Sequence, residues 1–154
     1  MVKNYLLDTN ILIFLVKNER FGSYFDKNYG NLPNRVICYS YISLGELESI
    51  IEKNHWGNRR RTALNRVLKG FKMIPVTSKK LIQHYGQIDA YSQGKLQNHP
   101  LPEGLSARNM GKNDLWISAT ASILEATLIT TDQDFEYLHK VFFSVEQINI
   151  QEFK

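Results

Sequence analysis

The sequence predicts an α/β protein, a three-layer α/β/α sandwich in which helices cover both faces of a central, mostly parallel sheet. Short apolar runs alternate with longer segments of helical apolar spacing along most of the chain. Such alternation is typical of parallel strands that are joined by helices. The chain has 154 residues, of which 43% are hydrophobic and 22% charged, and this fits one globular domain over residues 1–154.

The expected elements follow one another in a regular order. The apolar runs predict strands over residues 5–7, 36–39, 73–76, 127–129 and 145–150. The helical patterns predict helices over residues 11–17, 43–53, 58–71, 78–91 and 113–124. Residues 94–112 break this rhythm, because they contain Pro100 and Pro102 and have no clear period. A long irregular connection of this kind is more often functional or mobile than a packing element.

Composition and charge limit the classes of protein to consider. The formal net charge is +4, which by itself is weak evidence for a polyanionic partner. Met1 leads directly into strand-like sequence without a signal peptide, and the apolar runs are too short for a membrane span. The single cysteine, Cys38, lies inside an apolar run, where we expect a buried structural thiol. We therefore expect a cytoplasmic protein that does not engage a membrane.

Acidic residues stand at the ends of four of these elements: Asp8, Glu46, Asp114 and Asp132. Open α/β sheets bind ligands at the carboxyl ends of their strands, so these side chains are expected to converge on one edge of the sheet. Carboxylates that meet there repel one another unless a divalent cation lies between them. The pattern therefore predicts a metal site for phosphate chemistry. If four of the 15 acidic residues face a metal, the remaining 11 are outnumbered by 19 Lys and Arg, which suits a polyanionic substrate.

Each acid also has an alternative interpretation as part of a helix end. Asp8 suits the N-cap of the helix that follows it. Ser43-Leu44-Gly45-Glu46 matches a capping box, in which Glu46 reaches back to the Ser43 amide. Asp114 would offset the positive start of its helix, and residues 130–135 could be an ordinary strand-to-turn segment. Four acids at matching positions are harder to explain in this way together than singly.

Taken in order, four segments of the chain resemble the PIN-domain ribonucleases of the VapC-like toxin type. The segments are Tyr5-Leu6-Leu7-Asp8-Thr9-Asn10-Ile11-Leu12, Ser43-Leu44-Gly45-Glu46-Leu47, Met110-Gly111-Lys112-Asn113-Asp114-Leu115-Trp116-Ile117 and Leu128-Ile129-Thr130-Thr131-Asp132-Gln133-Asp134-Phe135. Their order and spacing match the family over residues 3–150. The resemblance implies a metal-dependent endoribonuclease, the toxin of a type II toxin–antitoxin system, that forms homodimers and is neutralised by a cognate antitoxin protein.

The resemblance also implies roles for individual residues. Asp8, Glu46, Asp114 and Asp132 would surround Mg²⁺ or Mn²⁺ as the catalytic acids.

Three auxiliary residues accompany them. Thr130 resembles the hydroxyl residue that braces the fourth motif, and Asn10 resembles the polar neighbour of the first acid. Asp134 is a second candidate for the fourth acid, but it precedes Phe135 and Leu138, where an acid commonly caps a short helix. We therefore expect Asp132 to be the ligand and Asp134 the cap.

The residue types fit this chemistry. Carboxylate oxygens suit Mg²⁺ or Mn²⁺, and none of the four segments has an adjacent His or Cys, which argues against zinc. A bound divalent ion would hold the scissile phosphate and lower the pKa of a water that attacks phosphorus in line, leaving a 5′-phosphate and a 3′-hydroxyl. Arg108 and Lys112 precede Asp114 and are the best-placed residues for RNA phosphates. Arg59-Arg60-Arg61 is interpreted as a solvated helix face.

Two other functions are considered. A phosphatase with an aspartyl nucleophile would also place an acid after the first strand, but such enzymes usually carry a second acid two residues later, where this chain has Asn10. The other alternative is a catalytically inactive PIN-like interaction module. The presence of all four acids argues against it, and a cleavage assay separates the two.

Overall fold

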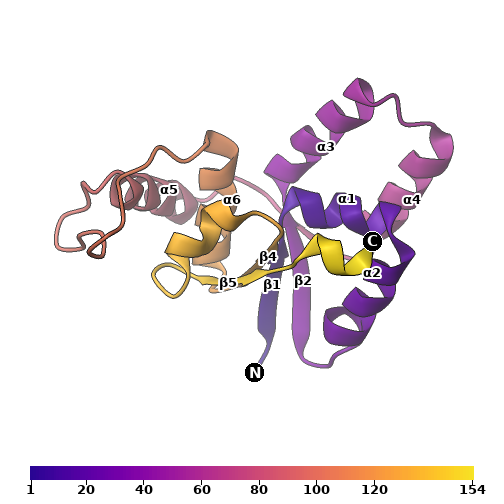
Figure 1. The fold of residues 1–154 in the computed structure, drawn as a ribbon, viewed down its shortest axis with the longest axis horizontal. Helices are drawn as coiled ribbons and strands as arrows, with labels where there is room; N and C mark the ends of the chain where they lie inside the picture. The colour runs from indigo at the N-terminus through magenta and orange to yellow at the C-terminus, as the bar shows by residue number, and fades with distance from the viewer.

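The computed structural model describes residues 1–154 and has the expected sheet with helices on both faces (Figure 1). Five parallel strands form the sheet in the order β3-β2-β1-β4-β5. The strands are β1 (Lys3–Leu7), β2 (Arg35–Ser40), β3 (Lys72–Ile74), β4 (Thr127–Thr130) and β5 (Ser144–Gln147). The α/β/α prediction is therefore confirmed.

Six α-helices and three shorter helical turns complete the fold. The helices are α1 (Thr9–Lys17), α2 (Glu19–Phe25), α3 (Tyr41–Lys53), α4 (Asn58–Lys69), α5 (Lys79–Ser92) and α6 (Lys112–Ile123). The shorter turns are the π-helical η1 (Asp26–Gly30) and the 3₁₀ helices η2 (Gln133–Leu138) and η3 (Ile150–Phe153). None of the helices is both long and apolar enough to cross a bilayer.

Alternation along the strands explains the three layers. Leu6 of β1 and Leu128 of β4 belong to the apolar core shared with α5 and α6. Their neighbours Leu7 and Ile129 belong to the core shared with α1, α2, α3 and α4. Side chains alternate between the faces of a strand, so β1 and β4 contribute to both cores. Cys38 is buried in the first of these cores, and burial raises the pKa of its thiol, as expected for a structural cysteine.

The helical segment over residues 19–30 was not predicted from the sequence. Phe21, Phe25 and Tyr29 are buried there at intervals of four residues, which is one face of a helix. The last expected strand, residues 145–150, ends early at Gln147, because Asn149 caps η3 by accepting from the Gln151 N–H.

Candidate active site

Asp8 lies directly after β1, at the carboxyl edge of the sheet, and is only 6% exposed. Its Oδ1 accepts a hydrogen bond from the Thr9 N–H at 2.8 Å, and its Oδ2 accepts one from the Thr130 hydroxyl at 2.7 Å. Asp8 is therefore the N-cap of α1 as well as part of the site. Burial, together with the charges of Glu46 and Asp132, raises the pKa of Asp8 to about 6.

Thr130 links the first and fourth acids. Its hydroxyl donates to Asp8 and accepts from the Asp132 N–H at 3.0 Å. A fully buried side chain therefore holds the Asp8 carboxylate in register with the turn after β4. Thr130 thus braces the fourth motif, as the family resemblance implied.

Glu46 lies in the second turn of α3, and its interpretation as a capping-box residue is wrong. The helix begins at Tyr41, and the cap is Ser40, whose hydroxyl accepts from the Ile42 N–H at 3.1 Å. Glu46 Oε1 instead accepts a hydrogen bond from the Thr9 hydroxyl at 2.7 Å.

Two buried hydroxyls were missed in the reasoning from sequence. Thr9 Oγ1 lies 2.9 Å from Ser43 Oγ, so that α1 and α3 meet through a pair of hydroxyl groups beside Glu46. A hydroxyl proton serves one acceptor, so Thr9 donates to Glu46 when Ser43 donates to Thr9. The only sequence signal for this brace is that Thr9 follows Asp8 directly and Ser43 precedes Glu46 by three residues.

Asp114 lies in the first turn of α6, after the N-cap Gly111, and is half-buried. Burial, together with the charges of Asp8, Asp132, Glu46 and Asp134, raises the pKa of Asp114 to about 6. The fold thus brings all four predicted acids within electrostatic range of one another. At this position the Asp114 carboxylate can also offset the positive charge at the start of α6, as the alternative interpretation held.

The expectation that Asp134 caps the short helix is wrong, and Asp132 as a metal ligand stays a prediction. The cap of η2 is Asp132, because its Oδ1 accepts the Asp134 N–H at 2.8 Å. Asp134 lies two residues further on, in the first turn of η2, is exposed, and acts on Asp114 through its charge. The turn after β4 is shorter than the sequence suggested, so the helix starts at Gln133.

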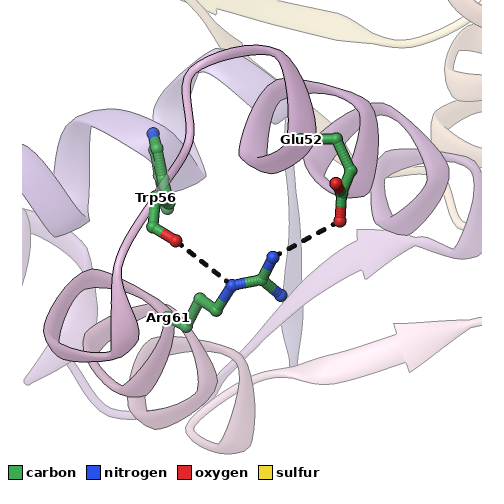
Figure 2. Close-up of polar contacts among 3 residues, drawn as sticks. All are labelled: Glu52, Trp56 and Arg61. Atoms are coloured by element: carbon green, nitrogen blue, oxygen red, sulfur yellow. Dashed lines mark hydrogen bonds and ion pairs between the residues drawn. The ribbon is translucent and has the colours of Figure 1, made fainter.

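The clustered acids have no basic partner. The one ion pair of the structure joins Arg61 and Glu52, 3.4 Å apart, at the other end of α3 (Figure 2). In the present side-chain conformations no three His, Cys, Asp or Glu residues form a ready-made metal cage. Mg²⁺ does not need such a cage, because it keeps several waters and is commonly bound through one or two carboxylates. Uncompensated carboxylates with two raised pKa values are a donor set that fits a hard divalent cation.

The arginines of the Arg59-Arg60-Arg61 run serve the turn between α3 and α4. Arg61 Nε donates to the Trp56 carbonyl at 3.3 Å while its guanidinium reaches Glu52 (Figure 2). The Arg60 guanidinium lies 5.3 Å from the centre of the Trp56 ring, and Arg59 is exposed. These contacts agree with a solvated helix face.

Arg108 lies beside the acids, in a hollow of about 260 Å³ whose wall includes Asp114 and Asp134. Its guanidinium lies 4.0 Å from the centre of the Tyr137 ring, and its backbone N–H donates to the Ser92 carbonyl at 2.8 Å. The irregular segment before α6 therefore serves to place an arginine next to the site. Lys112 is exposed at the first residue of α6 and does not line this hollow.

The chain was compared with known families and structures. The model of the PIN domain matches residues 5–141. The chain belongs to the PIN-domain family. This PIN domain is 31% identical over 126 residues to Ribonuclease VapC1 of Haemophilus influenzae (strain R2866), covering 82% of this chain and 84% of that protein. It is 28% identical over 137 residues to Ribonuclease VapC2 of Haemophilus influenzae (strain ATCC 51907 / DSM 11121 / KW20 / Rd), covering 86% and 89%.

Solved structures agree with this assignment. VapBC-1 from nontypeable Haemophilus influenzae aligns with this PIN domain at a TM-score of 0.66 and 26% identity, covering 94% of this chain and 97% of that chain. VapBC2 from Rickettsia felis, bound to a DNA fragment from its promoter, aligns at a TM-score of 0.72 and 24% identity, covering 95% and 99%. The latter likeness supports the fold.

Proposed function

We propose that this PIN domain is a metal-dependent endoribonuclease, the toxin of a toxin–antitoxin pair, and that Asp8, Glu46, Asp114 and Asp132 hold its Mg²⁺ or Mn²⁺. The observation that carries this proposal is the convergence of these acids without a basic partner. Burial, together with the charges of the neighbouring acids, raises the pKa of Asp8 and of Asp114 to about 6. The curated relatives are named ribonucleases, which supports RNA as the substrate.

The hydroxyl groups around the acids set their orientation. Each carboxylate oxygen can accept two hydrogen bonds or ligands, so a bond from Thr9 or Thr130 leaves a lone pair for a cation. A divalent ion bound there would neutralise the acids, hold the scissile phosphate and make a bound water more acidic. Partners of this kind, which fix the ligands without touching the ion, commonly contribute 10- to 100-fold, in rough terms, to affinity or activity.

Arg108 is proposed to hold a phosphate of the RNA next to the cut. It has no carboxylate partner within ion-pair distance, and it lies in the same hollow as Asp114. The Tyr137 ring behind its guanidinium limits the conformations of the side chain, so its donors stay directed at the site. Lys112, exposed two residues before Asp114, is proposed as a weaker contact.

The partners are proposed from the relatives. The solved neighbours are described as VapBC complexes, which supports a cognate antitoxin for this chain. A cluster of unneutralised acids is best inhibited by a segment that presents Arg or Lys to the carboxylates. The homodimer remains a prediction from the family resemblance, and sedimentation of the purified protein tests it.

The experiment that tests the function is cleavage of total RNA in Mn²⁺, with the ends of the products mapped. We expect 5′-phosphate and 3′-hydroxyl ends, loss of cleavage in EDTA, and recovery when Mg²⁺ or Mn²⁺ is added in excess. Asp8→Asn should lower the rate by about a thousandfold or more. Its amide oxygen still accepts from the Thr9 N–H, and its NH₂ group then faces the Thr130 hydroxyl, which accepts instead of donating.

Growth of cells is the second readout. Expression without an antitoxin should arrest growth, and Asp8→Asn should relieve the arrest. Cleavage that continues unchanged in chelator would overturn the mechanism, and harmless overproduction of active enzyme would overturn the toxin role.

A further inference from the structure

Two hollows lie beside α1, the turn after β4 and η3. Their volumes are about 460 Å³ and 420 Å³, and they share Thr131 and Ile150 in their walls. The two hollows therefore meet, and we call them together the amide groove. Arg108 and its hollow are not part of it.

The walls of the amide groove include close sequence neighbours of two of the acids. Thr131 lies between Thr130, which donates to Asp8, and Asp132. Gln133 follows Asp132 directly, and Asn10 is two residues after Asp8. The groove is therefore lined by residues of the same chain segments that carry Asp8 and Asp132.

The chemistry of the groove differs from that of the site it adjoins. No Asp or Glu lines either hollow. Five exposed amide side chains line the walls: Asn10, Gln133, Gln147, Asn149 and Gln151. Asn149 uses its Oδ1 to cap η3, which leaves its NH₂ group free to donate outward.

Apolar and basic groups complete the hollow of about 420 Å³. Phe14 and Ile13 supply apolar surface in its wall, and Lys17 and Lys154 supply positive charge. An aromatic ring beside a positively charged wall is the combination that binds single-stranded nucleic acid, because bases stack on the ring while the cations contact phosphates.

The far wall of the groove is firmly held. Phe153 of η3 packs edge-on against Phe14 and Phe21, with ring centres 6.2 Å and 5.2 Å apart. The Asn18 side-chain amide donates to the Phe153 carbonyl at 3.0 Å, which fixes η3 to the start of α2. Gln147, Asn149 and Gln151 stand on this wall, and they lie outside residues 5–141, the part of the chain that the family model matches.

We propose that the amide groove holds the nucleotides next to the scissile phosphate and that its Asn and Gln side chains read their bases. The inference rests on the proposed ribonuclease function. Amide side chains carry a donor and an acceptor side by side, and in this form they pair with the edges of unstacked bases in single-stranded RNA. Because the wall residues 147–151 lie outside the matched family region, they are suited to give this chain a sequence preference of its own.

The test compares two double variants on one substrate. Gln147→Ala/Gln151→Ala removes two amides from the groove, and Gln83→Ala/Gln87→Ala removes two exposed amides of α5, on the other side of the sheet. The probe is a pool of single-stranded RNA oligonucleotides with randomised positions around the cut, cleaved in Mn²⁺ and sequenced. Wild type should prefer particular bases beside the cut. The groove variant should lose about tenfold or more of this preference, and the α5 variant should keep it.

A second variant tests the groove by a change of charge that keeps the size of the side chain, so that a loss of fold is not mistaken for a loss of binding. Gln147→Glu keeps the size of the side chain and adds a negative charge, so KM for RNA should rise while kcat stays near wild type. Melting curves of all variants check that the exposed substitutions leave the fold intact. Wild type that cuts without any base preference beside the cut overturns the inference, as does a groove variant with an unchanged preference. A third outcome also overturns the inference. If the groove variant keeps its base preference and differs from wild type only in how a peptide bearing Arg and Lys inhibits cleavage, the groove is a protein-binding surface.

Failure of the ribonuclease function is recognised separately. If wild type cleaves no RNA in Mn²⁺, the proposed function has failed, and the groove is then tested by fluorescence polarisation of the same labelled oligonucleotides. Tighter binding by wild type than by the groove variant, with a base preference, supports the groove on its own. Equal binding by the two proteins overturns it.

Discussion

The candidate site has a closed half and an open half, and the two are built differently. In the closed half Asp8 and Glu46 are held by the hydroxyls of Thr9 and Thr130, and Asp8 is almost fully buried. In the open half Asp114 stands at the start of α6, beside a hollow that contains Arg108. No side chain donates a hydrogen bond to the Asp114 carboxylate.

This difference suggests a division of labour. Bonds that fix a carboxylate before the ligand arrives reduce the reorganisation needed to bind a cation, so the closed half is suited to hold the metal. In the open half, the guanidinium of Arg108 has no carboxylate partner and lies next to Asp114. It is therefore suited to receive a negatively charged substrate. The predictions below test this contrast, beginning with the largest expected effect.

The first prediction concerns the pH dependence of stability without metal. Because the pKa of Asp8 is raised from 3.8 to about 6, the unfolded chain loses this proton at lower pH than the folded protein does. Unfolding then releases a proton, so stability falls as pH rises from about 4 to 6. The loss attributable to Asp8 should approach about 3 kcal/mol above pH 6. Denaturant unfolding of wild type and Asp8→Asn in chelator from pH 4 to 7 measures it.

Asp8→Asn cannot ionise at this position, so the stability of wild type relative to the variant should decline across that window. Mn²⁺ at pH 7 should stabilise wild type again, because it binds only the folded state. If the difference in free energy of unfolding between the two proteins is constant from pH 4 to 7, the pKa of Asp8 is not raised by burial.

The second prediction concerns the brace in the closed half. Thr9→Val removes the hydroxyl that donates to Glu46 but keeps the shape of the side chain. We expect activity and Mn²⁺ affinity to fall by about 10- to 100-fold. Thr120→Val is the matched control, because it removes a buried hydroxyl of α6 that donates to the Trp116 carbonyl away from the acids. If both variants lose stability alike and neither loses metal affinity, the hydroxyl of Thr9 has a structural role alone.

The third prediction concerns the open half. Arg108→Gln should raise KM for RNA about tenfold and leave Mn²⁺ affinity unchanged, because it removes a phosphate contact and no carboxylate. Arg66→Gln, at an exposed position of α4, should change neither quantity. An equal drop in Mn²⁺ affinity for Arg108→Gln would erase the distinction between the two halves.

The smallest expected effect separates Asp132 from Asp134. Asp132→Ala should lower stability by about 1 kcal/mol, because it removes the cap of η2, and it should also reduce cleavage. Asp132→Asn keeps the cap and should reduce cleavage alone. Asp134→Ala, exposed in the first turn of η2, should change both properties little. Melting curves in EDTA and single-turnover cleavage in Mn²⁺ measure the two effects. Earlier melting of Asp134→Ala than of Asp132→Ala would restore the assignment made from sequence.

The sequence was sufficient for the layers of the fold and for the acids at its edge. Strands end in a common direction in a parallel sheet, so Asp8 and Asp132 had to emerge side by side once β1 and β4 were recognised. The helix ends were less predictable. Glu46 matches a capping box locally, yet Ser40 caps the helix instead, because the choice between two serines depends on where β2 ends.

The brace between Thr9 and Ser43 and the hollows could not be predicted. Thr9 meets Ser43 across 34 positions of the chain, and such a contact leaves no local pattern. Arg108 was expected beside Asp114, but its contact with the Tyr137 ring leaves no local pattern either. The buried face of residues 19–30, in contrast, was visible as Phe21, Phe25 and Tyr29.

The central claim is that these carboxylates bind a divalent cation, and binding of Mn²⁺ to the purified protein tests it most directly. Electron paramagnetic resonance of free Mn²⁺ counts the bound ions at pH 7, in wild type and in Asp8→Asn side by side. We predict saturable binding to wild type, and loss of that binding in Asp8→Asn with the fold preserved. Equal Mn²⁺ binding by the two proteins would contradict the account.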